Sequence, residues 1–186
     1  QDTETLCETA LEWLQGKTGQ RVIDLCSGSG CIAVAVDRFA PGNRVYALEK
    51  SPEAADYLSR NLALNQSRTE LVLADVLDPP EDLTGFDLVL SNPPYLNQEE
   101  MDTLQREVTF EPSMALYAQR DGYFFYEEIT RLWKKRLNPG AHLAYEVGWR
   151  QSQKVAQILK EQGFGEIAVR EDLCGVPRVV SGRWPG

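Results

Sequence analysis

Four consecutive residues, Asn92-Pro93-Pro94-Tyr95, carry the residue types best suited to chemistry in this sequence. The two prolines fix the backbone φ angle and remove two N–H donors, so carbonyl groups here can point at a ligand instead of into a sheet. The side-chain oxygen of Asn92 and the carbonyl oxygen of Pro93 can each accept one hydrogen from a planar NH₂ group, and Tyr95 can stack on its flat face. The tetrapeptide therefore predicts a site for an amino or amide group, with an ordinary turn as the alternative.

A glycine-containing segment at residues 24–30 is a second candidate site. It follows a short β-branched run and precedes an apolar helical pattern, which is typical of a turn between a strand and a helix. Glycines let the backbone approach a ligand closely, and the start of the helix offers free N–H groups to it. Taken alone, the segment is also explained by an ordinary tight turn.

Two acidic residues, Glu49 and Asp75, each follow a predicted strand. Glu49 lies about 20 residues beyond the glycine segment, where a carboxylate can accept hydrogen bonds from both hydroxyls of an adenosine ribose. Asp75 is placed to accept a hydrogen bond from an adenine amino group. A solvated acid beside Lys50 is the alternative for Glu49, and helix capping or surface exposure is the alternative for Asp75.

Alternating strand and helix patterns predict an α/β fold that positions these residues. Strands separated by helices at this spacing imply right-handed crossovers and a mostly parallel sheet with helices on both faces, and the last two strands are close enough to form an antiparallel hairpin. Ligands bind beyond the carboxyl ends of the strands in such a sheet. The predicted strands span residues 21–26, 44–48, 71–74, 86–91, 142–147, 166–170 and 178–182, and the predicted helices span residues 3–15, 31–39, 52–65, 123–137 and 151–162.

Length and composition limit the classes of protein that fit. The 186 residues suit one domain, 42% of them are hydrophobic, and no uncharged apolar run is long enough to span a bilayer. With 19 basic and 28 acidic residues the net charge is −9, which argues against binding duplex nucleic acid through its phosphates. Four scattered cysteines and the single His142 suggest neither a metal site nor a disulfide framework, so reduced thiols and a cytoplasmic location are expected.

Together these features resemble class I S-adenosylmethionine-dependent methyltransferases, in which a (D/N)PPY signature accompanies methylation of an amino nitrogen. Further matches narrow the resemblance to the HemK/PrmC family. Its members are protein-(glutamine-N5) methyltransferases that modify the glutamine of the Gly-Gly-Gln motif in peptide chain release factors. These further matches are Asp2-Thr-Glu4, Phe110-Glu-Pro112, Ala115-Leu116, Asp172-Leu-Cys-Gly175 and Arg178.

The resemblance implies a Rossmann-like class I methyltransferase fold with a seven-stranded sheet, and S-adenosyl-L-methionine as the cofactor. It implies a release factor as protein substrate and partner, without direct contact with nucleic acid or membrane. Residues 1–186 are expected to form the catalytic domain, because the family's N-terminal helical docking domain has no visible counterpart here. The implied catalytic residues are Asn92, Pro93 and Tyr95. The implied substrate-binding residues are Asn92, Pro93, Pro94, Tyr95, Phe110 and Glu111, and the implied cofactor-binding residues are Asp24, Cys26, Ser27, Gly28, Ser29, Gly30, Glu49, Asp75, Val76 and Asn92.

Three positions depart from the family pattern. Cys26 stands where the family usually has glycine, which predicts either a negative backbone φ or a small side chain beside the methionine portion of the cofactor. Glu49 stands in place of Asp and is one methylene longer. Val76 stands in place of an aromatic residue near adenine, so one stacking contact is expected to be lost.

Other proteins share parts of this pattern. A nucleic-acid amino methyltransferase uses the same tetrapeptide on adenine or guanine, but it needs a basic approach surface, and residues 96–121 contain two arginines against six acidic residues. A nicotinamide-dependent dehydrogenase does not explain the tetrapeptide, and an inactive partner subunit does not need it intact. The aromatic residues 123–126 and Trp133 are interpreted as core, and His142 as structural.

Overall fold

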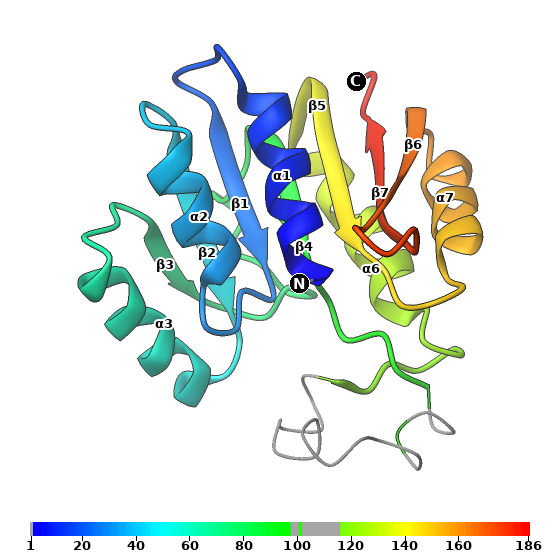
Figure 1. Ribbon diagram of the computed structural model, residues 1–186, viewed down its shortest axis with the longest axis horizontal. Coiled ribbons are helices and arrows are strands. Elements are labelled where there is room, and N and C mark those ends of the chain that lie inside the picture. Colours follow the sequence, from blue (N-terminus) through cyan, green and yellow to red (C-terminus); the bar gives the residue numbers. More distant parts are fainter. Residues whose placement is uncertain (1, 98–100, 102–115) are drawn as a thin grey trace.

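A seven-stranded sheet with the strand order β3-β2-β1-β4-β5-β7-β6 organises the protein (Figure 1). The computed structural model describes residues 2–97, 101 and 116–186. Strands β1 to β5 pair in parallel, whereas β7 runs antiparallel to both β5 and β6. The mostly parallel sheet and the C-terminal antiparallel hairpin are therefore confirmed. The strands span Arg21–Leu25 (β1), Arg44–Glu49 (β2), Glu70–Leu73 (β3), Phe86–Ser91 (β4), Leu137–Glu146 (β5), Gly165–Glu171 (β6) and Pro177–Arg183 (β7).

Helices cover both faces of the sheet and bury a core on each. Successive side chains of a strand point to opposite faces, so Val22 of β1 joins the core under α1, α2 and α3, while Ile23 joins the core under α6 and α7. Among the residues that the structure describes, no helix is long and apolar enough to cross a membrane. The helices span Asp2–Leu14 (α1), Cys31–Phe39 (α2), Pro52–Leu64 (α3), Phe124–Trp133 (α6) and Ser152–Glu161 (α7).

The connection between α6 and β5 differs from the predicted helix over residues 123–137. The α-helix ends at Trp133, a 3₁₀ turn covers Lys134–Arg136, and β5 begins at Leu137, which pairs with Phe86 of β4. Asn138 donates hydrogen bonds to the Gly85 carbonyl (3.1 Å) and to the Asp87 carboxylate (2.7 Å). The Asn-Pro-Gly sequence, typical of a turn, is accommodated as an irregularity in the β4–β5 register because these bonds tie it to the sheet.

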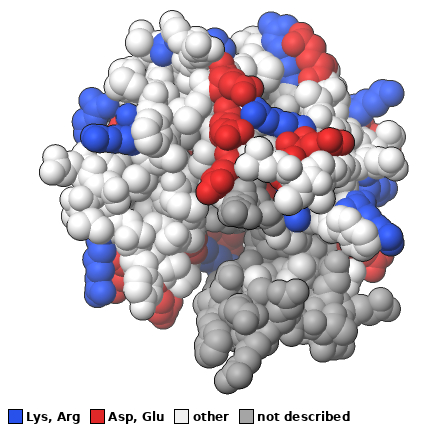
Figure 2. Space-filling view, viewed as in Figure 1, with Lys and Arg blue, Asp and Glu red and all other residues white. Residues whose placement is uncertain are grey.

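The first helix packs against the last strands of the chain. α1 contacts β5 and β7, and it lies across the middle of the sheet in Figure 1. Arg170 of β6 donates to Glu8 (2.9 Å) and Glu12 (2.8 Å) of α1. Glu4, Glu8 and Glu12 are exposed at intervals of one helical turn and form the acidic row over α1 in Figure 2. The first helix is therefore joined to the last three strands by packing against β5 and β7 and by ion pairs with β6.

A glycine is required where α2 begins. Gly30 is the N-cap residue of α2 and has a φ of 81°, in the left-handed region that glycine adopts at little cost. A Cβ at this position would overlap the Cδ1 atom of Leu58, a fully buried residue of α3. Gly30 therefore sets how closely α3 approaches the turn that follows β1.

We predict that Gly30→Ala lowers the free energy of unfolding by about 2–4 kcal/mol, because left-handed strain adds to overlap with Leu58. Gly28→Ala is the matched control, since Gly28 also has a positive φ of 54° but open space around its Cα. The control should cost about 1–2 kcal/mol, the strain alone. Urea unfolding of both variants measures the difference, and equal losses would show that the Leu58 contact contributes nothing.

Candidate active site

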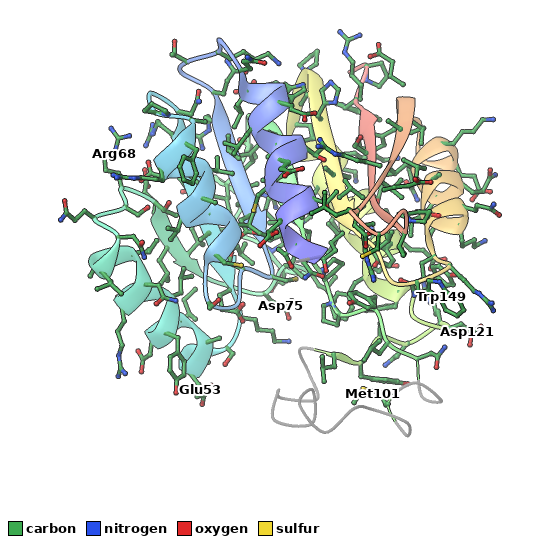
Figure 3. The ribbon with its side chains drawn as sticks, viewed as in Figure 1. Glu53, Arg68, Asp75, Met101, Asp121 and Trp149 are labelled. Atoms are coloured by element: carbon green, nitrogen blue, oxygen red, sulfur yellow. The ribbon has the colours of Figure 1, made fainter. Side chains whose placement is uncertain are left out.

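A cavity of about 660 Å³ opens at the carboxyl ends of β1, β2 and β4. Figure 3 labels Asp75 and Glu53 on this side of the molecule, and both line the cavity. The structure thus brings together residues from all four segments that the sequence singled out. The predicted site residues on the cavity wall are Cys26, Gly28, Ser29, Glu49, Asp75, Val76, Asn92 and Pro94.

The turn after β1 is held by hydrogen bonds to the end of β2. The Ser27 N–H donates to the Leu48 carbonyl (3.0 Å), and the single hydroxyl proton of Ser27 is shared between the carbonyls of Asp24 (2.7 Å) and Leu48 (3.2 Å). To make this turn, Cys26 adopts a φ of 57°. Of the two alternatives expected for Cys26, the negative φ is therefore wrong, and the small side chain beside the cofactor stays a prediction. The glycine that the family carries there suits the same backbone. The Cys26 side chain lines the cavity, and burial raises the pKa of its thiol.

Glu49 joins this turn to the start of α3. Its carboxylate accepts hydrogen bonds from the backbone N–H groups of Gly28, Lys50 and Ser51, each at 2.8 Å. A carboxylate offers about four acceptor positions, so three backbone bonds fix its orientation and leave room for a ligand hydroxyl. Glu49 is thus a cavity-lining acceptor whose position is determined by the backbone around it.

Asp75 forms an ion pair with Lys50 at the wall of the cavity. The Lys50 ammonium lies 2.7 Å from one oxygen of Asp75, and the other oxygen accepts a hydrogen bond from the Leu77 N–H at 2.9 Å. Partial burial alone would raise the pKa of the Asp75 carboxyl, but the bonds from Lys50 and Leu77 and the Lys50 charge bring it below its ordinary value. Asp75 is therefore ionised and can accept a hydrogen bond from an amino group. Lys50 was not predicted as a site residue.

The tetrapeptide after β4 is anchored from both sides. The buried Ser91 hydroxyl donates to the Leu25 carbonyl (2.9 Å), and the Tyr95 carbonyl accepts a hydrogen bond from the side chain of Gln151 (3.0 Å). Gln151 also accepts bonds from the Gly148 N–H (3.0 Å) and the Tyr126 hydroxyl (3.2 Å). Sequence reasoning missed Gln151, because its partners in the tetrapeptide and in α6, Tyr95 and Tyr126, are distant in the chain.

The four residues of the tetrapeptide have different positions at the cavity. Asn92 and Pro94 line it, Pro93 is buried, and Tyr95 is not on its wall. The Tyr95 ring instead packs so closely on Gly148 that a Cβ there would lie 2.9 Å from the ring. The Asn92 side chain makes no hydrogen bond to any other described residue, so its oxygen and nitrogen remain available to a ligand.

Aromatic side chains that were not predicted as site residues form part of the remaining wall, among them two that were interpreted as core. Tyr126 and Trp133 are buried in the core, as expected, but Phe124 and Phe125 of the same helix line the cavity. His142 is half-buried in β5 against Trp13, with ring centroids 5.3 Å apart, which agrees with a structural role. Phe110 and Glu111 lie outside the described residues. The other unpredicted wall residues are Leu48, Lys50, Ser51, Glu53, Ala54, Tyr57, Leu77, Tyr117 and Gln119.

Asp24 differs from the other predicted residues because it is buried behind the cavity wall. Its relative exposure is 1%, and neither carboxylate oxygen accepts a hydrogen bond among the described residues. Burial raises the pKa of Asp24 to about 8, and the nearby negative charge of Glu49 adds to this rise. Asp24 is therefore largely protonated at neutral pH.

Comparisons with known proteins decide the family. Residues 4–119 match the family model described as the methyltransferase small domain. A release factor glutamine methyltransferase of Clostridium acetobutylicum is 36% identical over 183 residues, which cover 96% of this chain. The one from Bordetella pertussis is also 36% identical, and the match covers 97% of this chain and 67% of the relative. The chain belongs to the release factor glutamine methyltransferase family.

This membership confirms the HemK/PrmC resemblance and the class I methyltransferase fold. A precorrin-6y C5,15-methyltransferase of Geobacter metallireducens has a TM-score of 0.67 at 17% identity, covering 95% of this chain and 86% of that one. A methyltransferase of Pyrococcus furiosus has a TM-score of 0.68 at 17% identity, covering 97% and 83%. The cofactor of the family is S-adenosyl-L-methionine. This chain spans 64% of the length of the Clostridium relative.

The buried Asp24 carboxyl predicts a pH dependence of stability. Its pKa is about 8 in the folded protein and about 3.9 in an unfolded chain, so the folded state holds the proton between these values. Its contribution to stability is therefore fully present below about pH 4 and is lost as the pH rises through about 8.

Urea unfolding of the wild type and Asp24→Asn from pH 4 to 8 isolates this effect. The free energy of unfolding of the wild type should fall relative to the variant, by at most about 1.4 kcal/mol per pH unit. A difference between the two proteins that stays constant with pH would contradict the assignment.

Proposed function

We propose that this protein transfers a methyl group from S-adenosyl-L-methionine to the side-chain N5 of the glutamine in the Gly-Gly-Gln motif of peptide chain release factors. The observation that carries the proposal is a single cavity lined both by the turn after β1 and by Asn92 and Pro94. The residues proposed to bind the cofactor and those proposed to bind the acceptor amide therefore line the same cavity. The names of the relatives from C. acetobutylicum and B. pertussis support the choice of substrate.

The residues on the cavity wall fit this cofactor. Glu49 offers its remaining acceptor position to a ribose hydroxyl, and Asp75 and Val76 would flank a position for adenine. The turn that includes Cys26 and Gly28 would hold the methionine portion, with Ser27 and Gly30 shaping that turn and Asp24 buried behind it. When bound, the cofactor supplies a methyl group on a sulfonium centre, which is open to attack by a nitrogen lone pair.

The tetrapeptide supplies orientation and charge stabilisation. An amide nitrogen is a poor nucleophile because its lone pair is delocalised into the carbonyl group. In the proposed mechanism, the Asn92 side-chain oxygen and the Pro93 carbonyl accept one hydrogen bond each from the acceptor NH₂ group. These bonds hold the nitrogen in line with the methyl group and favour the positive charge that develops on it. No general base is needed before transfer, because the methylated, positively charged nitrogen is strongly acidic and would pass its extra proton to water, leaving a neutral N-methyl amide.

The acidic balance of the chain favours this substrate over a nucleic acid. A nucleic-acid amino methyltransferase would share the tetrapeptide, but phosphate binding relies on clustered Lys and Arg, and the net charge is −9. We further propose that residues 1–186 act as the catalytic domain of a longer enzyme, since the Clostridium relative extends beyond the matched region. A release factor as partner implies action in the cytoplasm, where translation ends.

Mass spectrometry of a bacterial release factor, incubated with this protein and S-adenosylmethionine, tests the proposed function. One added methyl group on the glutamine of the Gly-Gly-Gln peptide is the expected result. An unmodified peptide together with methyl transfer to RNA or DNA in a parallel reaction would overturn the choice of substrate. Release factor with the acceptor glutamine changed to glutamate provides the control for the modified position.

Asn92→Ala should lower kcat for this reaction about a hundredfold, because one of the two acceptors for the NH₂ group is lost. Affinity for the cofactor should change little, since the adenosine and methionine contacts stay in place. Single-turnover kinetics and calorimetric titration of S-adenosylmethionine measure the two quantities. Asn65→Ala, at the exposed end of α3, is the matched control and should leave both unchanged. Equal rates for Asn92→Ala and wild type would contradict the role of Asn92.

A further inference from the structure

The chain directly after the tetrapeptide pairs with residues 116–118. The Leu96 N–H donates to the Leu116 carbonyl (2.9 Å), and the Ala118 N–H donates to the Leu96 carbonyl (2.8 Å). Side chains alternate along an extended backbone, and accordingly Ala118 is 2% exposed while Tyr117 and Gln119 both line the cavity. The pairing therefore fixes Tyr117 in the cavity wall beside the tetrapeptide.

The following turn holds this segment in place. Arg120, Asp121 and Gly122 have consecutive positive φ angles of 54°, 55° and 87°. A Cβ on Gly122 would overlap the Tyr95 carbonyl oxygen and approach the side chain of Gln151 to 2.7 Å. The turn thus packs on the same carbonyl that anchors the tetrapeptide, and Tyr117 and Asn92 belong to one connected unit.

The aromatic residues on the cavity wall are Tyr57, Tyr117, Phe124 and Phe125, and any of their rings could offer a face to the acceptor amide. Tyr95 does not line the cavity, and its ring packs on Gly148. Phe124 and Phe125 do line it, but their rings contact each other edge to face with centroids 5.4 Å apart. Tyr117 is 37% exposed and lies on the segment paired to Leu96.

We propose that Tyr117 is a substrate-binding residue whose ring face receives the plane of the acceptor amide during methyl transfer. The inference rests on the proposed function and adds a residue to it. The negative face of the ring attracts the positive charge that appears on the nitrogen as the methyl group is transferred, so the contact strengthens in the transition state. Tyr117 thereby acts on the nitrogen that Asn92 and Pro93 orient.

A second tyrosine in the same cavity provides a matched comparison. Tyr57 of α3 lines the cavity together with Glu53 and Ala54, in the helix that begins just after Glu49, and is 64% exposed. Because α3 follows Glu49, which is proposed to bind the ribose, we assign Tyr57 to the part of the cavity that would bind the cofactor. The two tyrosines should therefore affect different steps when their rings are removed.

The experiment compares Tyr117→Leu, Tyr117→Phe and Tyr57→Leu with the wild type. Steady-state kinetics with a release factor give kcat/KM, and calorimetric titration gives the Kd for S-adenosylmethionine. Tyr117→Leu should lower kcat/KM for the release factor about tenfold with an unchanged cofactor Kd, whereas Tyr117→Phe keeps the ring and should stay within about threefold. Tyr57→Leu should instead raise the cofactor Kd. Thermal unfolding identifies any variant that fails to fold.

Two results would overturn the inference. One is wild-type kcat/KM in Tyr117→Leu, and the other is a loss in Tyr117→Phe as large as in Tyr117→Leu, since either result means that the ring face is not used. If the wild type methylates no glutamine in the release factor, the proposed function itself fails and the inference fails with it. If the wild type methylates the glutamine and Tyr117→Leu has the same kcat/KM, the inference fails while the proposed function stands.

Discussion

The backbone reversal directly after β1 is the constraint on which the cavity depends. It places Cys26 in a left-handed conformation and Ser27 against the Leu48 carbonyl, which ties the turn to β2. The same turn presents the Gly28 N–H to Glu49, and it ends at Gly30, where α3 packs closely. The conformation of this turn thus determines the part of the cavity wall after β1 and the orientation of the Glu49 carboxylate. It also determines how closely α3 approaches the start of α2.

The grouping of the candidate site residues at strand ends could be predicted from the sequence, because each signal is local. The tetrapeptide, the glycine turn, Glu49 and Asp75 follow strands that run in parallel, and parallel strands bring their carboxyl ends to one edge. The predicted helix over residues 123–137 and the strand over 142–147 had wrong bounds, because the hydrogen bonds of Asn138 to the β4 region draw residues 137–141 into β5.

Residues positioned by long-range contacts escaped prediction. Gln151 reaches a carbonyl 56 positions away, and nothing in its immediate sequence identifies that partner. Tyr117 lies in the cavity wall because its segment pairs with Leu96. Nothing in the sequence around either residue identifies this pairing. The left-handed φ of Cys26 was missed for a related reason, since a non-glycine residue in this conformation reflects the bonds around it.

The packing of α1 has a consequence for folding during synthesis. This helix precedes every strand in the chain, yet it packs against β5 and β7 and pairs with Arg170 of β6. At elongation rates of about 5–20 residues per second, about 10–30 s separate the appearance of α1 from that of these partners. Part of its apolar face, which includes Leu6, Ala10 and Leu14, therefore stays exposed to solvent until the last strands have been synthesised.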